Sequence, residues 1–182
     1  PDVKIDVAGG GSSSGVKAAG DGTADIGNAS REVKDSEFDT YPDIKPFVIA
    51  RDGIAIVAHP EATVDELTIE QARQIFAGEI TRWNDERIVA ANPDVEMPDM
   101  NITVVTRSDS SGTTFVFSKH LAAVSDLFHD ADDEGTPAGA IVSGKTVEWP
   151  AIPTFVAAPK NDGITAMVTQ TPGSLGYIEY GY

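Results

Sequence analysis

The chain contains no cysteine among its 182 residues, which excludes disulfides, thiolate nucleophiles and cysteine metal ligands. Basic residues are scarce as well: 13 lysines and arginines stand against 29 aspartates and glutamates, and the formal net charge is −16. Proteins that bind nucleic acid carry a basic footprint, so this composition argues against that class. No apolar run approaches the length needed to cross a membrane. The hydrophobic content of 41% is nevertheless sufficient for a core.

The three histidines, His59, His120 and His129, are scattered and lack the spacing of metal ligands. We therefore expect no metal site and no cofactor. The abundant acidic residues are typical either of a solvated surface that maintains solubility or of adaptation to high salt, where screening acts at short range. We favour salt adaptation, because lysine is scarce while acidic residues are abundant.

Two hydroxyl-rich runs stand directly before segments with helical character: residues 9–17 read GGGSSSGVK and residues 107–114 read RSDSSGTT. A helix start offers free N–H groups and the positive end of the helix dipole, which together favour a tetrahedral anion. Glycine lets the backbone approach the anion, and serine and threonine add uncharged donors. Arg107 adds a charged fork that can bind two oxygens. The pattern indicates an oxyanion-binding site and does not by itself require catalysis.

Hydrophobic periodicity predicts an α/β protein in which strands alternate with helices. A capping box at Thr68–Gln71 marks one helix start, and Ile69, Ala72, Ile75 and Phe76 share a face of that helix. We expect strands at 3–7, 24–27, 46–50, 53–58, 102–105 and 176–180, helices at 16–22, 69–77, 117–128 and 164–169, and a loop at 130–139. Both hydroxyl-rich runs then fall between a strand and a helix, where ligands bind in open α/β sheets.

Six stretches resemble, in family order, the PstS-type substrate-binding proteins of phosphate ABC transporters. They are residues 11–17, 24–31, 51–55, 67–83, 107–117 and 171–178, which together extend over nearly the whole chain. The resemblance implies a two-lobed periplasmic-binding-protein fold of class II, with a small mixed sheet flanked by helices in each lobe and crossing strands between the lobes. It implies an incomplete first lobe at 1–50, a second lobe at 51–175 and a strand at 176–182 that returns to the first lobe.

The resemblance also implies a set of phosphate ligands. In the first lobe these are Ser12, Ser13 and Ser30, and in the second they are Arg107, Ser111, Gly112 and Thr113. Asp109 matches the acid that pairs with the arginine and orients it.

Two departures from the family pattern affect this expectation. Ser30 stands where several members have a carboxylate that accepts the proton of hydrogen phosphate, so the rejection of sulfate is expected to be weaker. The family also has a further strand and a threonine-containing loop before this region, and continues beyond the closing strand. We therefore expect the chain to be a core fragment.

The implied function is a non-enzymatic receptor that captures inorganic phosphate outside the cytoplasmic membrane and delivers it to an ABC permease. We expect a monomer, located in the periplasm or at the cell surface, with lipid anchoring of the full-length protein left open. One alternative is a receptor for sulfate or molybdate. Another is a serine-dependent acyl-transfer enzyme, because Ser14 and Lys17 fit an S-x-x-K pattern, although the companion motifs of such enzymes are missing.

Overall fold

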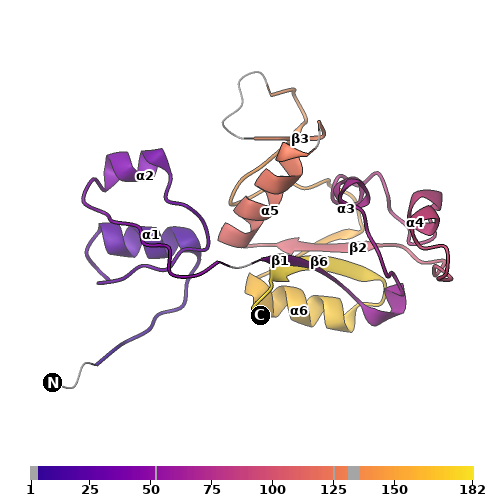
Figure 1. Cartoon of the computed structure of the whole chain (residues 1–182), viewed down its shortest axis with the longest axis horizontal. Coiled ribbons are helices and arrows are strands. Elements are labelled where there is room, and N and C mark those ends of the chain that lie inside the picture. The colour runs from indigo at the N-terminus through magenta and orange to yellow at the C-terminus, as the bar shows by residue number, and fades with distance from the viewer. Residues whose placement is uncertain (1–3, 52, 125, 131–135) are drawn as a thin grey trace. The chain divides into compact units, whose positions relative to one another are not determined.

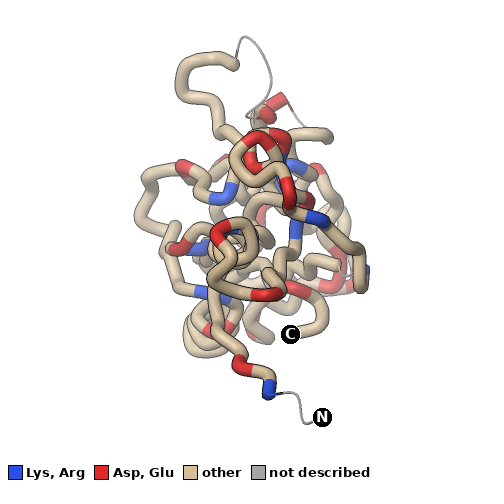
Figure 2. Tube along the Cα trace, turned by 90° about the vertical axis from the view of Figure 1, so that its left-hand side faces the viewer, with Lys and Arg blue, Asp and Glu red and all other residues tan. Residues whose placement is uncertain are grey.

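The computed structural model describes residues 4–51, 53–124, 126–130 and 136–182. The chain divides into two compact units, a first unit Pro1–Ile49 and a second unit Ala50–Tyr182 (Figure 1). Among the described residues, no helix is both long and apolar enough to cross a membrane. Aspartate and glutamate are distributed along the traces of both units, while lysine and arginine are few (Figure 2).

The second unit is built on a four-stranded mixed sheet, which confirms the α/β class. Its strands are β1 (Ile54–Ala58), β2 (Thr103–Arg107), β5 (Phe155–Ala158) and β6 (Ser174–Glu179), in the order β1-β6-β2-β5. β6 is antiparallel to β1 and parallel to β2, and β2 is parallel to β5. A separate parallel pair joins β3 (Phe128–His129) to β4 (Ile141–Val142).

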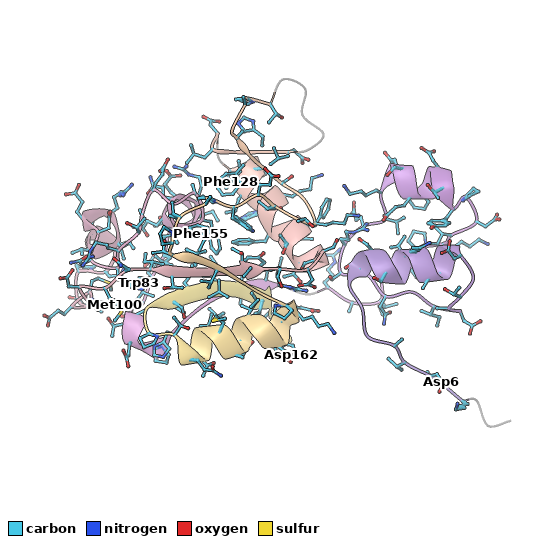
Figure 3. All side chains as sticks on the ribbon, turned by 180° about the vertical axis from the view of Figure 1, so that it is seen from behind. Asp6, Trp83, Met100, Phe128, Phe155 and Asp162 are labelled. Atoms are coloured by element: carbon cyan, nitrogen blue, oxygen red, sulfur yellow. The ribbon has the colours of Figure 1, made fainter. Side chains whose placement is uncertain are left out.

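Helices cover both faces of this sheet. In Figure 1, α6 (Lys160–Gln170) lies on one side, and α3 (Ile69–Phe76) and α5 (Gly112–Ala123) lie on the other. The larger core, on the α3 and α5 side, contains the fully buried rings of Phe76, Trp83 and Tyr177. The remaining short elements are the 3-10 turn η1 (Pro60–Ala62) and α4 (Glu86–Ala91). Figure 3 shows Trp83 and Met100 at one end of the sheet and Asp162 near the opposite end, in the first turn of α6.

Local sequence signals explain the start and end of α3. The Thr68 side chain accepts the N–H of Gln71 while the Gln71 side chain accepts the N–H of Thr68, as the capping box predicts. Gly78 adopts a φ of +76° directly after the helix, a conformation that favours glycine. Of the predicted apolar face, Ala72, Ile75 and Phe76 are buried, whereas Ile69 is half exposed.

The first unit differs from the expectation of a small sheet. It contains α1 (Ser12–Gly20) and α2 (Asp35–Thr40), and its described residues form no strand. In the segments predicted as strands, Ile5, Ile26 and Val48 are 79%, 82% and 88% exposed. A strand requires a neighbour for its backbone hydrogen bonds, and the described residues of this unit provide none for these segments.

Other boundaries also differ from the sequence expectations. The division between units falls at Ile49/Ala50, whereas the predicted first lobe ended at residue 50. β6, which contains most of the predicted closing strand, pairs with β1 and β2 and lies in the second unit, while the return of residues 176–182 to the first lobe stays a prediction. The helix predicted to reach residue 128 ends at Ala123, and Phe128 belongs to β3 instead. Of the predicted loop 130–139, residues 131–135 lie outside the described residues.

Candidate functional site

The predicted ligands of the first unit gather at the start of α1; Ser12, Ser13 and Ser30 are called the first half-site below. Ser12 is buried, and its Oγ accepts the backbone N–H of Ser30 at 3.1 Å. The two hydroxyl oxygens of Ser12 and Ser30 lie 3.1 Å apart. Gly15 N–H makes the first i→i−4 bond of the helix, to Gly11 O, so helix geometry leaves the N–H groups of Ser12 and Ser13 without a helical carbonyl. Uncharged donors therefore concentrate at this helix start.

Two glycines explain why Ser30 can lie beside Ser12, although 18 residues separate them. A Cβ added to Gly15 would lie 2.1 Å from Asn28 O, and one added to Gly27 would lie 2.1 Å from Gly15 O. Only the absence of both side chains lets the 27–28 backbone pack directly against α1. These two positions therefore fix the approach of Ser30 to the helix start.

Arg31 lies next to this half-site and was not predicted to have a role. Its side chain is fully buried, and Nη1 and Nη2 donate to the two carboxylate oxygens of Glu37 at 2.8 and 2.7 Å. Nη1 also donates to Glu32 O at 2.7 Å, and Nη2 to Ser13 Oγ at 3.4 Å. Both hydrogens of each terminal nitrogen are thus directed at protein acceptors. Arg31 consequently supports the first half-site through Ser13, and its terminal nitrogens have no N–H left to bind an anion.

The predicted ligands of the second unit lie where β2 ends and α5 begins; Arg107, Asp109, Ser111, Gly112 and Thr113 are called the second half-site. Ser111 is the N-cap of α5, and its Oγ accepts Thr114 N–H at 3.1 Å. Ser111 N–H in turn donates to Lys145 O at 2.9 Å. Gly112 and Thr113, the first residues of α5, are buried. The sequence prediction of a strand, a hydroxyl loop and a helix start agrees with this arrangement.

Arg107 and Asp109 form a bidentate ion pair at the carboxyl end of β2. Arg107 Nε and Nη2 donate to Asp109 Oδ1 and Oδ2 at 2.8 and 2.6 Å, and the Arg107 side chain is only 7% exposed. Hydrogen bonding from Arg107, with a further bond from Lys160 N–H, lowers the pKa of Asp109 to about 2. Asp109 therefore stays ionised at neutral pH and fixes the direction of the guanidinium.

Tyr177 supports this half-site and was not among the predicted residues. Its OH lies 2.7 Å from Thr114 Oγ1, and its ring stacks on Phe117 with centroids 4.5 Å apart. Burial raises the pKa of Tyr177 to about 12, so the hydroxyl stays protonated at physiological pH. Tyr177 lies on β6, 63 residues from Thr114, and nothing local in the sequence indicates this contact.

The S-x-x-K pair has the wrong electrostatics for an acylating site. Lys17 Nζ lies 2.5 Å from Asp21 Oδ2, and this hydrogen bond raises the pKa of Lys17. A lysine that deprotonates a serine needs a lowered pKa instead. Ser14 and Lys17 are better explained as residues of an exposed helix surface.

The structure brings the eight predicted residues together as two groups. Ser12, Ser13 and Ser30 lie together in the first unit, and the other five lie together in the second. Among the described residues, no group of three or more histidine, aspartate or glutamate side chains could hold a metal ion. Two surface hollows of about 600 and 690 Å³ lie elsewhere in the second unit, against α3 and α5 and against β1 and η1.

Comparisons with known proteins agree with this fold. Residues 1–182 match the family described as "PBP superfamily domain", and the chain therefore belongs to the PBP superfamily. Two curated relatives are the phosphate-binding proteins PstS of Methanocaldococcus jannaschii and Xylella fastidiosa (strain 9a5c). They are 34% and 35% identical to the chain, and the alignments cover 100% and 95% of it. They cover 47% and 44% of the relatives, so the chain spans about half their length.

Solved structures of phosphate-binding proteins also match the fold of this chain. A substrate-binding protein from Clostridium perfringens, assigned to a phosphate ABC transporter and holding bound phosphate, matches with a TM-score of 0.68 at 28% identity. An ABC-type phosphate transport receptor from Vibrio cholerae matches with a TM-score of 0.55, also at 28% identity. Each alignment covers 94% of this chain and 57% of the solved one. The fold is thus that of two-lobed PstS-type binding proteins.

Proposed function

We propose that the chain binds inorganic phosphate outside the cytoplasmic membrane for delivery to an ABC permease, without catalysis, as a monomer. In this proposal, phosphate is held by Ser12, Ser13 and Ser30 and by Arg107, Ser111, Gly112 and Thr113. The observation that carries the proposal is the second half-site, where a nearly buried arginine lies beside the capped start of α5. The similarity to phosphate-binding relatives supports the choice of phosphate among oxyanions.

The distribution of charge fits an anion receptor within an acidic protein. Long-range repulsion works against an anion approaching a chain of net charge −16, so affinity has to come from donors at short range. Asp109 offsets part of the charge of Arg107, and the remaining predicted ligands are uncharged hydroxyl and N–H groups. Many neutral donors around one oriented cation bind an oxyanion without burying an excess of charge.

A receptor for another oxyanion is the second candidate, and one observation favours it. Hydrogen phosphate has a proton to donate at neutral pH and sulfate has none, so a carboxylate acceptor separates the two. Ser30 provides a hydroxyl at the expected position, and the neighbouring Glu37 carboxylate is bound to Arg31 through both oxygens. Ser30 therefore contributes a hydroxyl in place of a carboxylate to the first half-site, and the Glu37 carboxylate is used by Arg31.

Calorimetric titration with phosphate in molar KCl, repeated in excess sulfate, tests the proposal. High salt suits the acidic surface, because screening reduces its self-repulsion. Phosphate binding that persists in sulfate is the expected result. Binding that sulfate abolishes favours the general oxyanion receptor, and absence of binding by a chain that is folded by circular dichroism contradicts both.

A further inference from the structure

The first turn of α6 lies beside Arg107 because of the register of two parallel strands. In the pairing of β2 with β5, Arg107 is opposite Ala158, and Ser108 N–H donates to Ala158 O at 3.0 Å. Both strands end at this point, so the loop after β2 and the start of α6 emerge side by side. Figure 3 shows Asp162 in this first turn of α6.

Asn161 contacts Arg107 on a nitrogen that Asp109 does not use. Arg107 Nη1 donates to Asn161 Oδ1 at 3.3 Å, whereas Asp109 binds Nε and Nη2. An arginine has five N–H donors, two on each terminal nitrogen and one on Nε. Among the described residues, these three contacts leave one N–H on Nη1 and one on Nη2. The guanidinium is thus restrained by two elements and retains one donor on each terminal nitrogen.

The backbone at the start of α6 adopts a left-handed conformation that allows this contact. Lys160 has a φ of +57°, although it is not a glycine, and its N–H donates to Asp109 Oδ1 at 2.9 Å. Left-handed backbone at a non-glycine residue costs about 1 kcal/mol or more, and such strain concentrates at functional sites. The turn is also tight, since a Cβ on Gly163 would lie 2.8 Å from Pro159 Cδ. This turn places Lys160 against Asp109 and Asn161 against Arg107.

An amide suits this position better than a second carboxylate would. Asn161 Oδ1 accepts a hydrogen bond without adding charge, whereas a second carboxylate would give the Arg107 cluster a net negative charge and repel an anion. Asp109 already offsets part of the guanidinium charge, so what the Nη1 side still requires is orientation.

From these contacts we propose that Asn161 is a positioning residue for Arg107: it restrains Nη1 so that the two remaining terminal N–H groups bind two oxygens of one oxyanion. The proposal rests on the proposed phosphate-binding function for its ligand. Asn161 acts through Arg107 and need not touch the anion.

A double-mutant cycle on the full 182-residue chain tests this inference, with inorganic phosphate as the titrant. Asn161→Ala is expected to weaken phosphate binding about three- to tenfold, which corresponds to the loss of one hydrogen bond. In an Arg107→Lys background, which lacks the second terminal nitrogen, the same substitution is expected to change affinity less than twofold. Thr169→Ala is the matched control: it removes one side-chain hydrogen bond, to Thr165 O, near the far end of α6, and should leave affinity unchanged. Equal losses in both backgrounds, or wild-type affinity of Asn161→Ala, would overturn the proposal.

Arginine side-chain NMR in phosphate-free buffer gives a readout that does not depend on binding. In the wild type, hydrogen bonding at Nη1 should slow rotation of that group and resolve its two protons, which the Arg107→Lys spectrum identifies by their absence. Asn161→Ala should average the Nη1 pair while the Nε–H signal, held by Asp109, persists. An unchanged Nη1 pair contradicts the positioning role. If the wild-type chain binds no phosphate, the proposed function fails, and this spectrum still decides whether Asn161 restrains Arg107.

Discussion

Arg31 in the first unit and Arg107 in the second both lie beside a serine-rich helix start, yet they differ in the hydrogen bonds they have left to give. Arg31 directs both hydrogens of each terminal nitrogen at protein acceptors, mainly Glu37. Arg107 keeps one hydrogen on each terminal nitrogen after its bonds to Asp109 and Asn161. Proximity to an anion loop therefore does not identify a ligand. Under the proposed function, the number of unused donors distinguishes Arg107, as a ligand of the anion, from Arg31, which has a structural role.

The largest effects are expected from removing each arginine in turn. One substitution should mainly lower stability, and the other should mainly weaken phosphate binding. Arg31→Ala leaves the largely buried carboxylate of Glu37 without its main partner, so we expect the first unit to lose roughly 3 kcal/mol of unfolding free energy. Urea unfolding followed by circular dichroism measures the change. Lys17→Ala is the control, because it breaks an exposed ion pair of the same unit and should change stability little. Similar effects of the two substitutions would contradict the structural role of Arg31.

Arg107→Ala should weaken phosphate binding and lower stability less than Arg31→Ala does, because Asp109 is 32% exposed and keeps the hydrogen bond from Lys160 N–H. Loss of two charge-assisted hydrogen bonds to phosphate predicts about 100-fold weaker affinity by calorimetry. Arg82→Ala removes an exposed ion pair with Asp99 in the same unit and should bind phosphate within about twofold of the wild type. Unchanged affinity of Arg107→Ala would exclude this loop as the anion site.

Changing Ser30 tests whether the first half-site controls selectivity. Ser30→Asp adds an acceptor for the phosphate proton and a repulsive lone pair for sulfate, so the ratio of phosphate to sulfate affinity should rise about tenfold. Competition titrations at pH 7 give this ratio. Ser30→Ala has no acceptor and should not raise it. A ratio that is the same in all three proteins would show that Ser30 does not face the anion.

The smallest expected effect concerns the Asp109–Arg107 ion pair. It is a change in how the free energy of unfolding depends on pH under acidic conditions. The folded-state pKa of Asp109, about 2, lies below its ordinary value of 3.8, so its stabilisation is present above pH 4 and is lost as the pH falls towards 2. After allowance for partial exposure, the expected difference from Asp109→Asn is about 1 kcal/mol at pH 5 and declines below pH 4. Parallel urea titrations of both proteins between pH 2 and 6 measure it. A constant difference over that range would be inconsistent with this ionisation.

The sequence predicts those parts of the molecule whose causes are local. The capping box of α3 and the β-branched apolar run of β1 depend on neighbouring residues, and both form as expected. The hydroxyl-rich run of residues 107–114 likewise leads into α5, and Ser111 within this run caps the helix. The predicted strands of the first unit do not form, because alternation in the sequence specifies a strand only where another strand is available to pair with it.

The supporting residues were not predicted because their partners are distant. Tyr177 reaches Thr114 across 63 residues, and Arg107 reaches Asn161 across 54. Arg31 follows Ser30 in the sequence, but its role cannot be predicted locally, since its pairing with Glu37 depends on how the 31–37 segment folds back. The sequence thus predicted the candidate ligands and Asp109, whereas the roles of Tyr177, Asn161 and Arg31 follow only from the tertiary structure.

The order of strands has a consequence for how the chain folds. β6, the last strand in the sequence, lies between β1 and β2, and its pairing with β1 joins residues more than a hundred positions apart. Contacts of such separation slow folding, because a long loop has to close before they form. On the ribosome, β1 would emerge early and remain unpaired until β6, which ends at Glu179, had been synthesised. The second unit is therefore expected to complete its sheet only after translation has passed residue 179, and until then the side of β1 that pairs with β6 is exposed and prone to aggregation.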